Sequence, residues 1–472
     1  MSRPPPDLIR LLDNPAALSP DTGDFRSILY TVGSDGRRKW IYAQILAGAW
    51  RTRRRLVSLV LIGFYLALPF LTVGGNPFLR FDLPKRQFWI LGHAFWPQDL
   101  SYLLFFVLIA IIATLLAVAL AGRVFCGWGC PHNVFLEMVF RPIEAFIQGD
   151  AWSRARRDRE GGNGLRRVLT WGAFALVAGV LANTATALFV GTEAFRWGLV
   201  VDPVTHPAAA GFFAVFFALI MINFAWFREQ TCLVVCPYGR FQSVLLDPHS
   251  LTVGYDVRRG EPRGKPGTAT GDCIDCGLCV AVCPTGVDIR NGNQLECIHC
   301  TACIDACDGI MAKLKRPPGL IRYASEVGLA GGTRRVLRPR TVLYAVLLVI
   351  LGTVAVWRVT DRQPILATLL RPVGMPLFVE QDGGRWVRQA VTLSLVNRSG
   401  AAQQLTISIP AEPAARIALQ HALIDLPVDA RIELTPTIDL PAERLTDDLR
   451  PALRLTAADG RTTDLSISLR RP

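Results

Sequence analysis

Cys273-Ile-Asp-Cys276-Gly-Leu-Cys279-Val-Ala-Val-Cys283-Pro284 is followed, after a short gap, by Cys297-Ile-His-Cys300-Thr-Ala-Cys303-Ile-Asp-Ala-Cys307-Asp308. In each run, two residues separate the first three cysteines, and three residues separate the third from the fourth. Three cysteines at this spacing wrap one corner of a cubane 4Fe-4S cluster, and the fourth ligates the neighbouring cluster. Zinc is the alternative, but zinc sites favour two separated pairs around one ion. The doubled run therefore predicts two 4Fe-4S clusters.

The exchange of the fourth cysteine assigns eight ligands, as in a bacterial-type two-cluster ferredoxin. Cluster 1 is expected on Cys273, Cys276, Cys279 and Cys307, and cluster 2 on Cys297, Cys300, Cys303 and Cys283. Asp308 takes the place of the expected proline, which removes no ligand. Two adjacent clusters are suited to passing single electrons, so the first functional prediction is electron transfer.

Apolar runs point to a membrane. The chain has 472 residues, of which 51% are hydrophobic and 19% charged, with a formal net charge of +13. Five runs approach the roughly 20 apolar residues that cross a bilayer, at 56–73, 100–121, 168–190, 208–227 and 341–359. The arginines cluster beside these runs, which favours the lipid bilayer as the partner of the positive charge and argues against nucleic acid.

The arginines also predict an orientation. They are concentrated at 51–55, 123–167 and 334–340, and positively charged loops stay on the cytoplasmic side. We therefore expect a multi-pass protein of the bacterial inner membrane, with its N-terminus and ferredoxin domain cytoplasmic. An odd number of spans then places the C-terminal domain in the periplasm. No cysteine follows Cys307, so the cysteines are interpreted as metal ligands and redox thiols in a reducing compartment.

Alternating apolar and polar residues at 391–396, 405–409 and 465–469 predict β-strands, and short strands over about 100 residues suggest an immunoglobulin-like sandwich. The predicted fold is a polytopic α-helical membrane protein with an inserted α+β di-cluster ferredoxin domain and a C-terminal all-β immunoglobulin-like sandwich. Its parts are an N-terminal segment (1–55), a four-helix membrane domain (56–245), the ferredoxin domain (246–335), a fifth membrane helix (341–359) and the sandwich (365–472).

A second cysteine motif occurs twice. Cys126-Gly-Trp-Gly-Cys130-Pro131 follows the second span, and Cys232-Leu-Val-Val-Cys236-Pro237 follows the fourth, which indicates a duplicated hairpin. Because proline is favoured at the first position of a helix, Cys130 and Cys236 are expected to cap short interfacial helices. There the helix dipole and the nearby Arg123, Arg228 and Arg240 should favour thiolate.

Four such thiolates could bind Cu(I), bind another cluster or cycle as disulfides, and the alternative is that these cysteines are buried and inert. His132 and His299 stand beside the cysteine motifs and are interpreted as ordinary interfacial or loop residues, with metal binding as the alternative. The spans contain no histidine pairs for a membrane-crossing haem ladder, so electrons should be used at the cytoplasmic face.

Five stretches together resemble the CcoG family (also called FixG or RdxA), accessory proteins for cbb-type cytochrome c oxidase. The stretches are 123–131, 228–242, 255–263, 271–308 and 319–323. The resemblance implies reduction of Cu(II) to Cu(I) in the cytoplasm before a copper-exporting ATPase uses it. Copper ions, that ATPase and the oxidase assembly machinery are the implied partners, and the thiols of Cys126, Cys130, Cys232 and Cys236 are the expected site. His132 and His299 depart from the glutamine and glycine expected at their positions.

Two other functions fit the same residues. One is a quinol-linked electron conduit like the polyferredoxin subunits of anaerobic reductases, which a quinol pocket between spans would support. The other is a non-enzymatic scaffold whose clusters only report redox state. Stoichiometric copper on the purified protein would favour a cupric reductase over both.

Overall fold

Among the residues that the structure describes, four helices are long and apolar enough to cross a membrane, as judged from their length and hydropathy. They are α3 (Leu100–Ala121), α8 (Gly164–Val190), α10 (Pro207–Met221), which continues as a π-helical segment η5 (Ile222–Phe227), and α16 (Pro339–Thr360). They correspond to four of the five predicted spans, and α8 begins four residues before the predicted Val168. Many side chains of α8 are buried inside the protein, whereas few side chains of α3, α10 and α16 are buried, as expected of lipid-facing helices.

The first predicted span has different bounds in the structure. Helix α2 covers Ala49–Ala67, so it begins earlier than the predicted Leu56 and ends before the predicted Val73. A short 3₁₀ turn η2 (Leu68–Phe70) and strand β1 (Thr72–Val73) follow it, because Pro69 lacks the N–H that would continue the helix. Helix α2 carries four arginines near its start and is not among the four apolar helices. The count of five spans stays a prediction.

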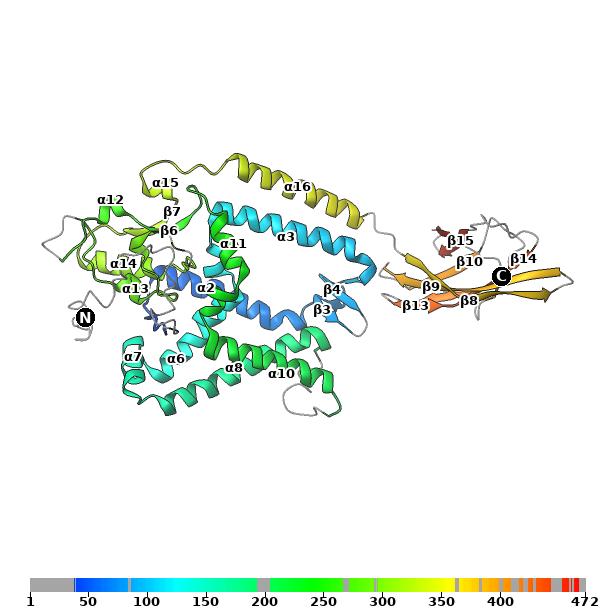
Figure 1. Cartoon of the computed structure of the whole chain (residues 1–472), viewed down its shortest axis with the longest axis horizontal. Helices are drawn as coiled ribbons and strands as arrows, with labels where there is room; N and C mark the ends of the chain where they lie inside the picture. Colours follow the sequence, from blue (N-terminus) through cyan, green and yellow to red (C-terminus); the bar gives the residue numbers. More distant parts are fainter. Residues whose placement is uncertain are drawn as a thin grey trace. The chain divides into compact units, whose positions relative to one another are not determined.

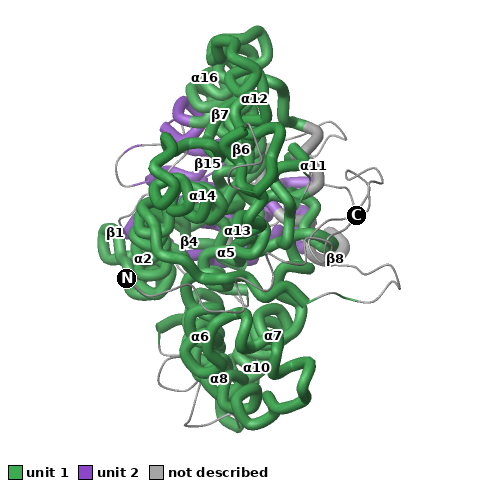
Figure 2. The backbone as a smooth tube through the Cα atoms, turned by 90° about the vertical axis from the view of Figure 1, so that its left-hand side faces the viewer, with its two compact units in different colours: residues 1–355 green, residues 356–472 purple. Residues whose placement is uncertain are grey.

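The protein is described here from a computed structural model, which divides into residues 1–355 and 356–472 (Figure 2). The described residues are 38, 40–83, 86–192, 204–265, 271–292, 294, 296–360, 365–381, 384–398, 402–408, 416–418, 423–427, 430–442, 452–457, 460 and 462–466. Most of the predicted N-terminal segment, parts of the predicted strands 405–409 and 465–469, and the side chain of Arg240 therefore lie outside the described part.

Each cysteine hairpin continues into short helices that pack at one end of the apolar helices. After α3 come α4 (Val124–Trp128), α5 (Pro131–Phe135), the π-helical η4 (Leu136–Phe140), α6 (Arg141–Gln148) and α7 (Ala151–Glu160). After η5 come the π-helical η6 (Thr231–Val235) and α11 (Pro237–Leu245). Cys130 and Cys236 have extended backbones and cap α5 and α11, as the following prolines predict.

The ferredoxin part begins with strand β6 (Thr252–Tyr255), which pairs with the later strand β7 (Ile321–Ala324). The two strands are antiparallel, and Thr252 lies opposite Ala324. The helices between and after them are α12 (Val257–Gly260), α13 (Leu278–Ala281), η7 (Ile289–Asn291), α14 (Ala302–Lys313) and α15 (Glu326–Leu329). Val253, Met311 and Leu320 are buried in a core shared with the cysteines. In Figure 1 this part lies at the end of the apolar helices opposite to β3 and β4.

The short strands at that opposite end form two small sheets. Strands β1 and β2 (Asn76–Pro77) pair with each other, and β3 (Leu79–Asp82), β4 (Gln87–Ile90) and β5 (His93–Phe95) form an antiparallel sheet before the 3₁₀ turn η3 (Pro97–Asp99). They connect α2 to α3.

The start of α2 is tied to the ferredoxin part. The first N–H groups of a helix have no partner inside the helix, and Gly48, at the cap position, has no side chain to supply one. The carboxylate of Asp305, on α14, accepts hydrogen bonds from the backbone N–H groups of Trp50 (3.0 Å) and Arg51 (2.7 Å). A Cβ atom at position 48 would collide with the Asp305 side chain, so glycine is needed for this approach.

The C-terminal unit consists of two antiparallel sheets. One has the order β12 (Ile424–Leu426), β10 (Gln403–Ser408), β15 (Ala452–Ala457), β16 (Thr462–Ser466). The other has the order β11 (Arg416–Ala418), β14 (Thr437–Pro441), β9 (Gly384–Asn397), β13 (Arg431–Leu434), with β8 (Ile365–Gln381) also paired to β9. Side chains of both sheets, such as Leu393 and Leu455, form one core. The predicted strand 391–396 lies within β9, and the immunoglobulin-like arrangement stays a prediction.

Candidate iron–sulfur and thiol sites

The structure gathers the eight ferredoxin cysteines around two cavities. One cavity, here called cavity 1, is lined by Cys273, Cys276, Cys279 and Cys307. The other, cavity 2, is lined by Cys283, Cys297, Cys300 and Cys303, with Cys279 also at its edge. These are the two sets that the exchange pattern predicts, and each contains one cysteine from the opposite run. Cluster ligation itself stays a prediction.

The two runs fold into loops of the same shape. Asp275 and Gly277 in the first run have left-handed backbone angles, and so do His299 and Thr301 at the equivalent places of the second. Three non-glycine residues in this region are unusual and need support from their surroundings. The repeated turn curls each loop so that its three cysteines face one cavity, and the helices α13 and α14 begin directly afterwards.

The cysteines of both cavities are buried or half-buried and pack against apolar side chains. Burial, together with the neighbouring cysteines, raises the pKa of the Cys297 and Cys307 thiols to about 12. Thiols in such a place hold their protons until a positively charged metal centre replaces them. A buried, multiply thiol-lined cavity of this kind fits an iron–sulfur cluster.

Arg54 supplies a buried positive charge beside cavity 2. Its side chain is buried, its Nε donates a hydrogen bond of 2.6 Å to the carbonyl oxygen of Gly127, and it lines a small cavity together with Cys300. Its buried Nη2 has no hydrogen-bond partner among the described residues. The sulfur atoms of a cluster would offer the missing acceptor. No local pattern distinguishes Arg54 from Arg53 or Arg55, so the sequence predicts only that these arginines lie on the cytoplasmic side of the membrane.

The four cysteines of the duplicated hairpins also come together, and they are called the four-thiol site below. The thiol of Cys126 donates to Gln242 Oε1 (3.1 Å), and that of Cys232 to Asn133 Oδ1 (3.6 Å). Asn133 Nδ2 donates in turn to the carbonyl oxygen of Cys126 (2.7 Å). The Cys232 thiol is close enough to those of Cys126, Cys130 and Cys236 to interact electrostatically with all three. The two hairpins therefore face each other across one site.

The pKa values of two thiols in this site are raised, and the thiolate character of Cys130 and Cys236 stays a prediction. Burial and the neighbouring thiols raise the pKa of Cys126 to about 12 and raise that of Cys232 well above its usual range. The guanidinium of Arg228, which the sequence predicts to lie near these thiols, forms two hydrogen bonds with Glu144 (3.0 and 2.8 Å). Among the described residues, no three His, Cys, Asp or Glu side chains are arranged to hold a single metal ion.

Cavity 2 and the four-thiol site are in direct contact. The backbone N–H of Arg123 donates to His299 Nδ1 (3.1 Å), and its Nη1 donates to the carbonyl oxygen of Cys297 (3.3 Å). Gly127 packs on the same loop, since a Cβ there would lie 2.6 Å from the carbonyl oxygen of Ile298. Arg123 and Gly127 flank Cys126, so one turn of α4 connects the two sites.

The two histidines have different surroundings. His299 is not an ordinary loop residue, because it is buried in the contact just described, where burial and the Arg123 charge lower its pKa to about 3 and leave it neutral. His132 stacks on Phe224, with ring centroids 5.4 Å apart, and its Nδ1 lies 3.0 Å from Asn223 Nδ2. His132 therefore packs at the helix ends, as interpreted from the sequence.

A buried ion network joins the second hairpin to cavity 2. Arg228 and Arg154 lower the pKa of Glu144 to about 2, although burial alone would raise it. Glu229 directly follows Arg228, and its Oε2 lies 3.4 Å from Arg141 Nη2. The same Arg141 Nη2 donates a hydrogen bond to the carbonyl oxygen of Pro284 (3.0 Å). Pro284 directly follows Cys283. Isolated buried charges are unstable, so the network fixes the hairpin against the ferredoxin loop.

Comparisons with known proteins agree with this arrangement. Residues 227–326 match the family model of a 4Fe-4S dicluster domain, and residues 103–158 that of a 4Fe-4S binding domain. Protein RdxA of Cereibacter sphaeroides is 34% identical over 89% of this chain and 94% of its own length. Nitrogen fixation protein FixG of Rhizobium meliloti is 30% identical over 80% of each chain. Ferredoxin-type protein NapH of Haemophilus influenzae is 25% identical over 58% of this chain and 92% of its own length.

Proposed function

The chain belongs to the CcoG family of iron–sulfur electron-transfer proteins, which includes FixG and RdxA, and we propose that it reduces Cu(II) to Cu(I) at the four-thiol site. The observation that carries the proposal is the contact between cavity 2 and that site. Arg123 is bonded to the cavity-2 loop at Cys297 and lies three residues before Cys126. Electrons therefore have a short covalent and hydrogen-bonded route from the ferredoxin part to the thiols.

The chemistry at the thiols is a one-electron step. Each Cu(II) takes up one electron and becomes Cu(I), and a soluble one-electron reductant restores the ferredoxin part. Bound clusters supply the one-electron carriers. Thiolate sulfur is a soft ligand that prefers Cu(I), so the four thiols both favour the reduced ion and retain it. Burial raises the pKa of Cys126 and Cys232, which donate hydrogen bonds to Gln242 and Asn133, so these two stay protonated thiols until the metal arrives.

The proposed setting is the bacterial inner membrane, with the ferredoxin part in the cytoplasm and the C-terminal unit in the periplasm. The Cu(I) would pass to a copper-exporting ATPase for assembly of cbb-type cytochrome c oxidase. The arginines that suggest this orientation also bind the end of α3 beside the ferredoxin part. Arg334 and Arg338 donate to the carbonyl oxygens of Leu120 (2.6 Å) and Ala119 (2.8 Å), where a helix C-terminus favours positive charge.

Serine in place of Cys130 or Cys236 should reduce the rate of Cu(II) reduction by at least about tenfold, because a hydroxyl is a poor ligand for Cu(I). The measurement is Cu(I) formation by the dithionite-reduced, desalted protein, together with iron content. Iron content should not change, because the ferredoxin cysteines are separate. Val235→Ser is the matched control, since this exposed side chain lies in the same motif. Full reduction by the variant lacking all four thiols would refute the assignment, and loss of iron as well would favour a further cluster there.

The affinity for Cu(I) should rise with pH between pH 6 and 8. The pKa of Cys126 is raised to about 12 by burial, so the free thiol is protonated throughout this range and metal binding must release its proton. Each proton released increases the apparent affinity about tenfold per pH unit. Competition with a chromophoric Cu(I) chelator, corrected for the chelator's own titration, measures the slope. An affinity independent of pH would show that copper does not bind to these thiols.

A further inference from the structure

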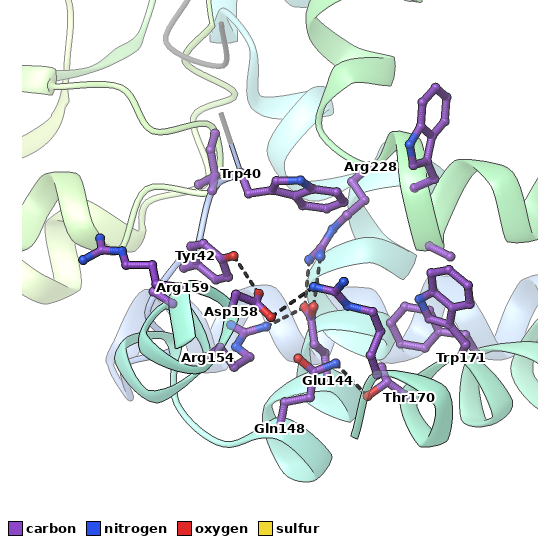
Figure 3. Close-up of a pocket in the computed structure, with 16 residues that line it drawn as sticks. Trp40, Tyr42, Glu144, Gln148, Arg154, Asp158, Arg159, Thr170, Trp171 and Arg228 are labelled. Carbon is purple, nitrogen blue, oxygen red and sulfur yellow. Dashed lines mark hydrogen bonds and ion pairs between the residues drawn. The ribbon is translucent and has the colours of Figure 1, made fainter. Parts of the chain in front are cut away.

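A cavity of about 520 Å³ lies beside the ferredoxin-side ends of α8 and α10, distinct from cavities 1 and 2 (Figure 3). It is formed where α6, α7, the first turns of α8, the end of η5 and the segment at 40–42 meet. Its size falls within the range of pockets that bind small molecules. Neither the iron–sulfur sites nor the four-thiol site uses it.

The polar side of this cavity carries a net positive charge. Four arginines and two carboxylates line it, which gives a formal charge of +2 (4 − 2): Arg154, Arg159, Arg167, Arg228, Glu144 and Asp158. Both carboxylates are already neutralised. Glu144 lies 2.6 Å from Arg154 and 2.8 Å from Arg228, and Asp158 lies 3.0 Å from Arg167 and accepts a hydrogen bond from the Tyr42 hydroxyl (2.7 Å). Figure 3 shows Glu144 pointing toward the guanidinium group of Arg228 and Asp158 lying beside Tyr42, whereas Arg159 extends away from them.

Arg159 makes no ion pair within the described part of the chain. Arg159 is exposed where it lines the cavity, and arginines beside a membrane surface attract anionic headgroups. The cavity therefore suits an occupant with a negatively charged group.

The other side of the cavity is apolar and belongs to the membrane helices. Trp171 and Phe174 lie in the first turns of α8, and Ala225 and Trp226 lie at the end of η5. The two tryptophans are 51% and 58% exposed, as is typical of residues at the boundary between headgroups and hydrocarbon. An occupant must therefore have an apolar part beside its charged part.

We propose that this cavity binds an anionic phospholipid, with the phosphate against Arg159 and Arg167 and the acyl chains along Trp171 and Trp226. A neutral quinone would fit the apolar wall but would leave the positive charge uncompensated. Because Arg228 lines the cavity and Glu229 beside it joins the network to cavity 2, the bound lipid stabilises the hairpin that carries Cys232. The proposal does not depend on copper reduction.

Native mass spectrometry of the full-length protein, loaded with phosphatidylglycerol or phosphatidylcholine, tests this proposal. The wild type should retain phosphatidylglycerol about tenfold better, since each arginine near a membrane surface favours an anionic lipid. Arg159→Gln/Arg167→Gln should abolish the preference. The control variant Arg156→Gln/Arg166→Gln removes the same amount of charge from the same two helices, at positions that do not line the cavity. This control should keep the preference for phosphatidylglycerol. Arg159→Gln alone changes only an exposed side chain and should give an intermediate preference.

A low iron content identifies any variant that fails to fold. If the double variant of Arg159 and Arg167 fails in this way, the lipid preference of the single Arg159→Gln variant tests the proposal instead. Equal retention of phosphatidylglycerol by the cavity and control variants would overturn the proposal. A protein without lipid preference that binds a neutral quinone would also overturn it and would indicate a quinol site. Inorganic phosphate has the charge without the acyl chains and should leave the lipid bound, and complete exchange would show that the site takes free phosphate instead.

Discussion

Serine in place of Cys307 should remove cluster 1 and leave cluster 2, although Cys307 belongs to the second cysteine run. Its thiol lines cavity 1 with the three cysteines of the first run, whereas Cys283 lines cavity 2. The iron content of the purified protein should fall from about eight to about four atoms per chain. Iron analysis and low-temperature EPR of the reduced protein measure this change.

Two further variants make the assignment specific. Cys276→Ser should give the same residual EPR spectrum as Cys307→Ser, and Cys300→Ser the same spectrum as Cys283→Ser. If the spectra pair within a run instead, so that Cys307→Ser matches Cys300→Ser, the exchange of the fourth ligand is wrong. A zinc-containing protein with no reducible visible spectrum would refute both clusters.

Glutamine in place of Arg54 should lower the reduction potential of cluster 2. Reduction adds negative charge to the cluster, and Arg54 is a buried positive charge next to Cys300 with a free Nη2 among the described residues. Removing a unit charge at such a position destabilises the reduced state by about 1 kcal/mol or more, which is on the order of 50 mV for a one-electron couple. An EPR-monitored potentiometric titration measures the shift.

The neighbouring residues provide the controls for Arg54. Arg54→Lys keeps the charge and should keep most of the potential, and Arg53→Gln removes an exposed charge from the same helix and should leave the potential unchanged. If Arg54→Gln binds both clusters and titrates like the wild type, Arg54 only packs against Gly127. An equal shift with Arg53→Gln would indicate a general effect of net charge.

The sequence predicted the parts of the site that depend on local spacing. Three cysteines separated by pairs of residues can surround one cavity only if the loop curls, and the left-handed residues at 275, 277, 299 and 301 provide that curl. The prolines after Cys130 and Cys236 likewise fix where a helix begins. These features are determined within about ten residues, so a motif is enough to identify them.

The contact between the two sites depends on residues far apart in the chain. Arg123 meets His299 176 positions away, and Arg54 meets Gly127 73 positions away. Spacing does not encode such contacts, so His299 was interpreted as a loop residue and Arg54 as a topology signal. The helix at the first predicted span has other bounds than the predicted 56–73 for another reason. A hydropathy pattern takes no account of Pro69, which ends the helix early. It also excludes the arginines, although α2 begins before them at Ala49.

The bond between Asp305 and the start of α2 makes assembly of this protein depend on its order of synthesis. The ribosome releases Trp50 255 residues before Asp305, so α2 emerges without the carboxylate that caps it, an interaction typically worth about 1 kcal/mol. Asp305 lies between two cysteines of cavity 2 and cavity 1, Cys303 and Cys307. A nascent chain whose loop around Asp305 stays unfolded for lack of metal would thus leave the start of α2 without its cap.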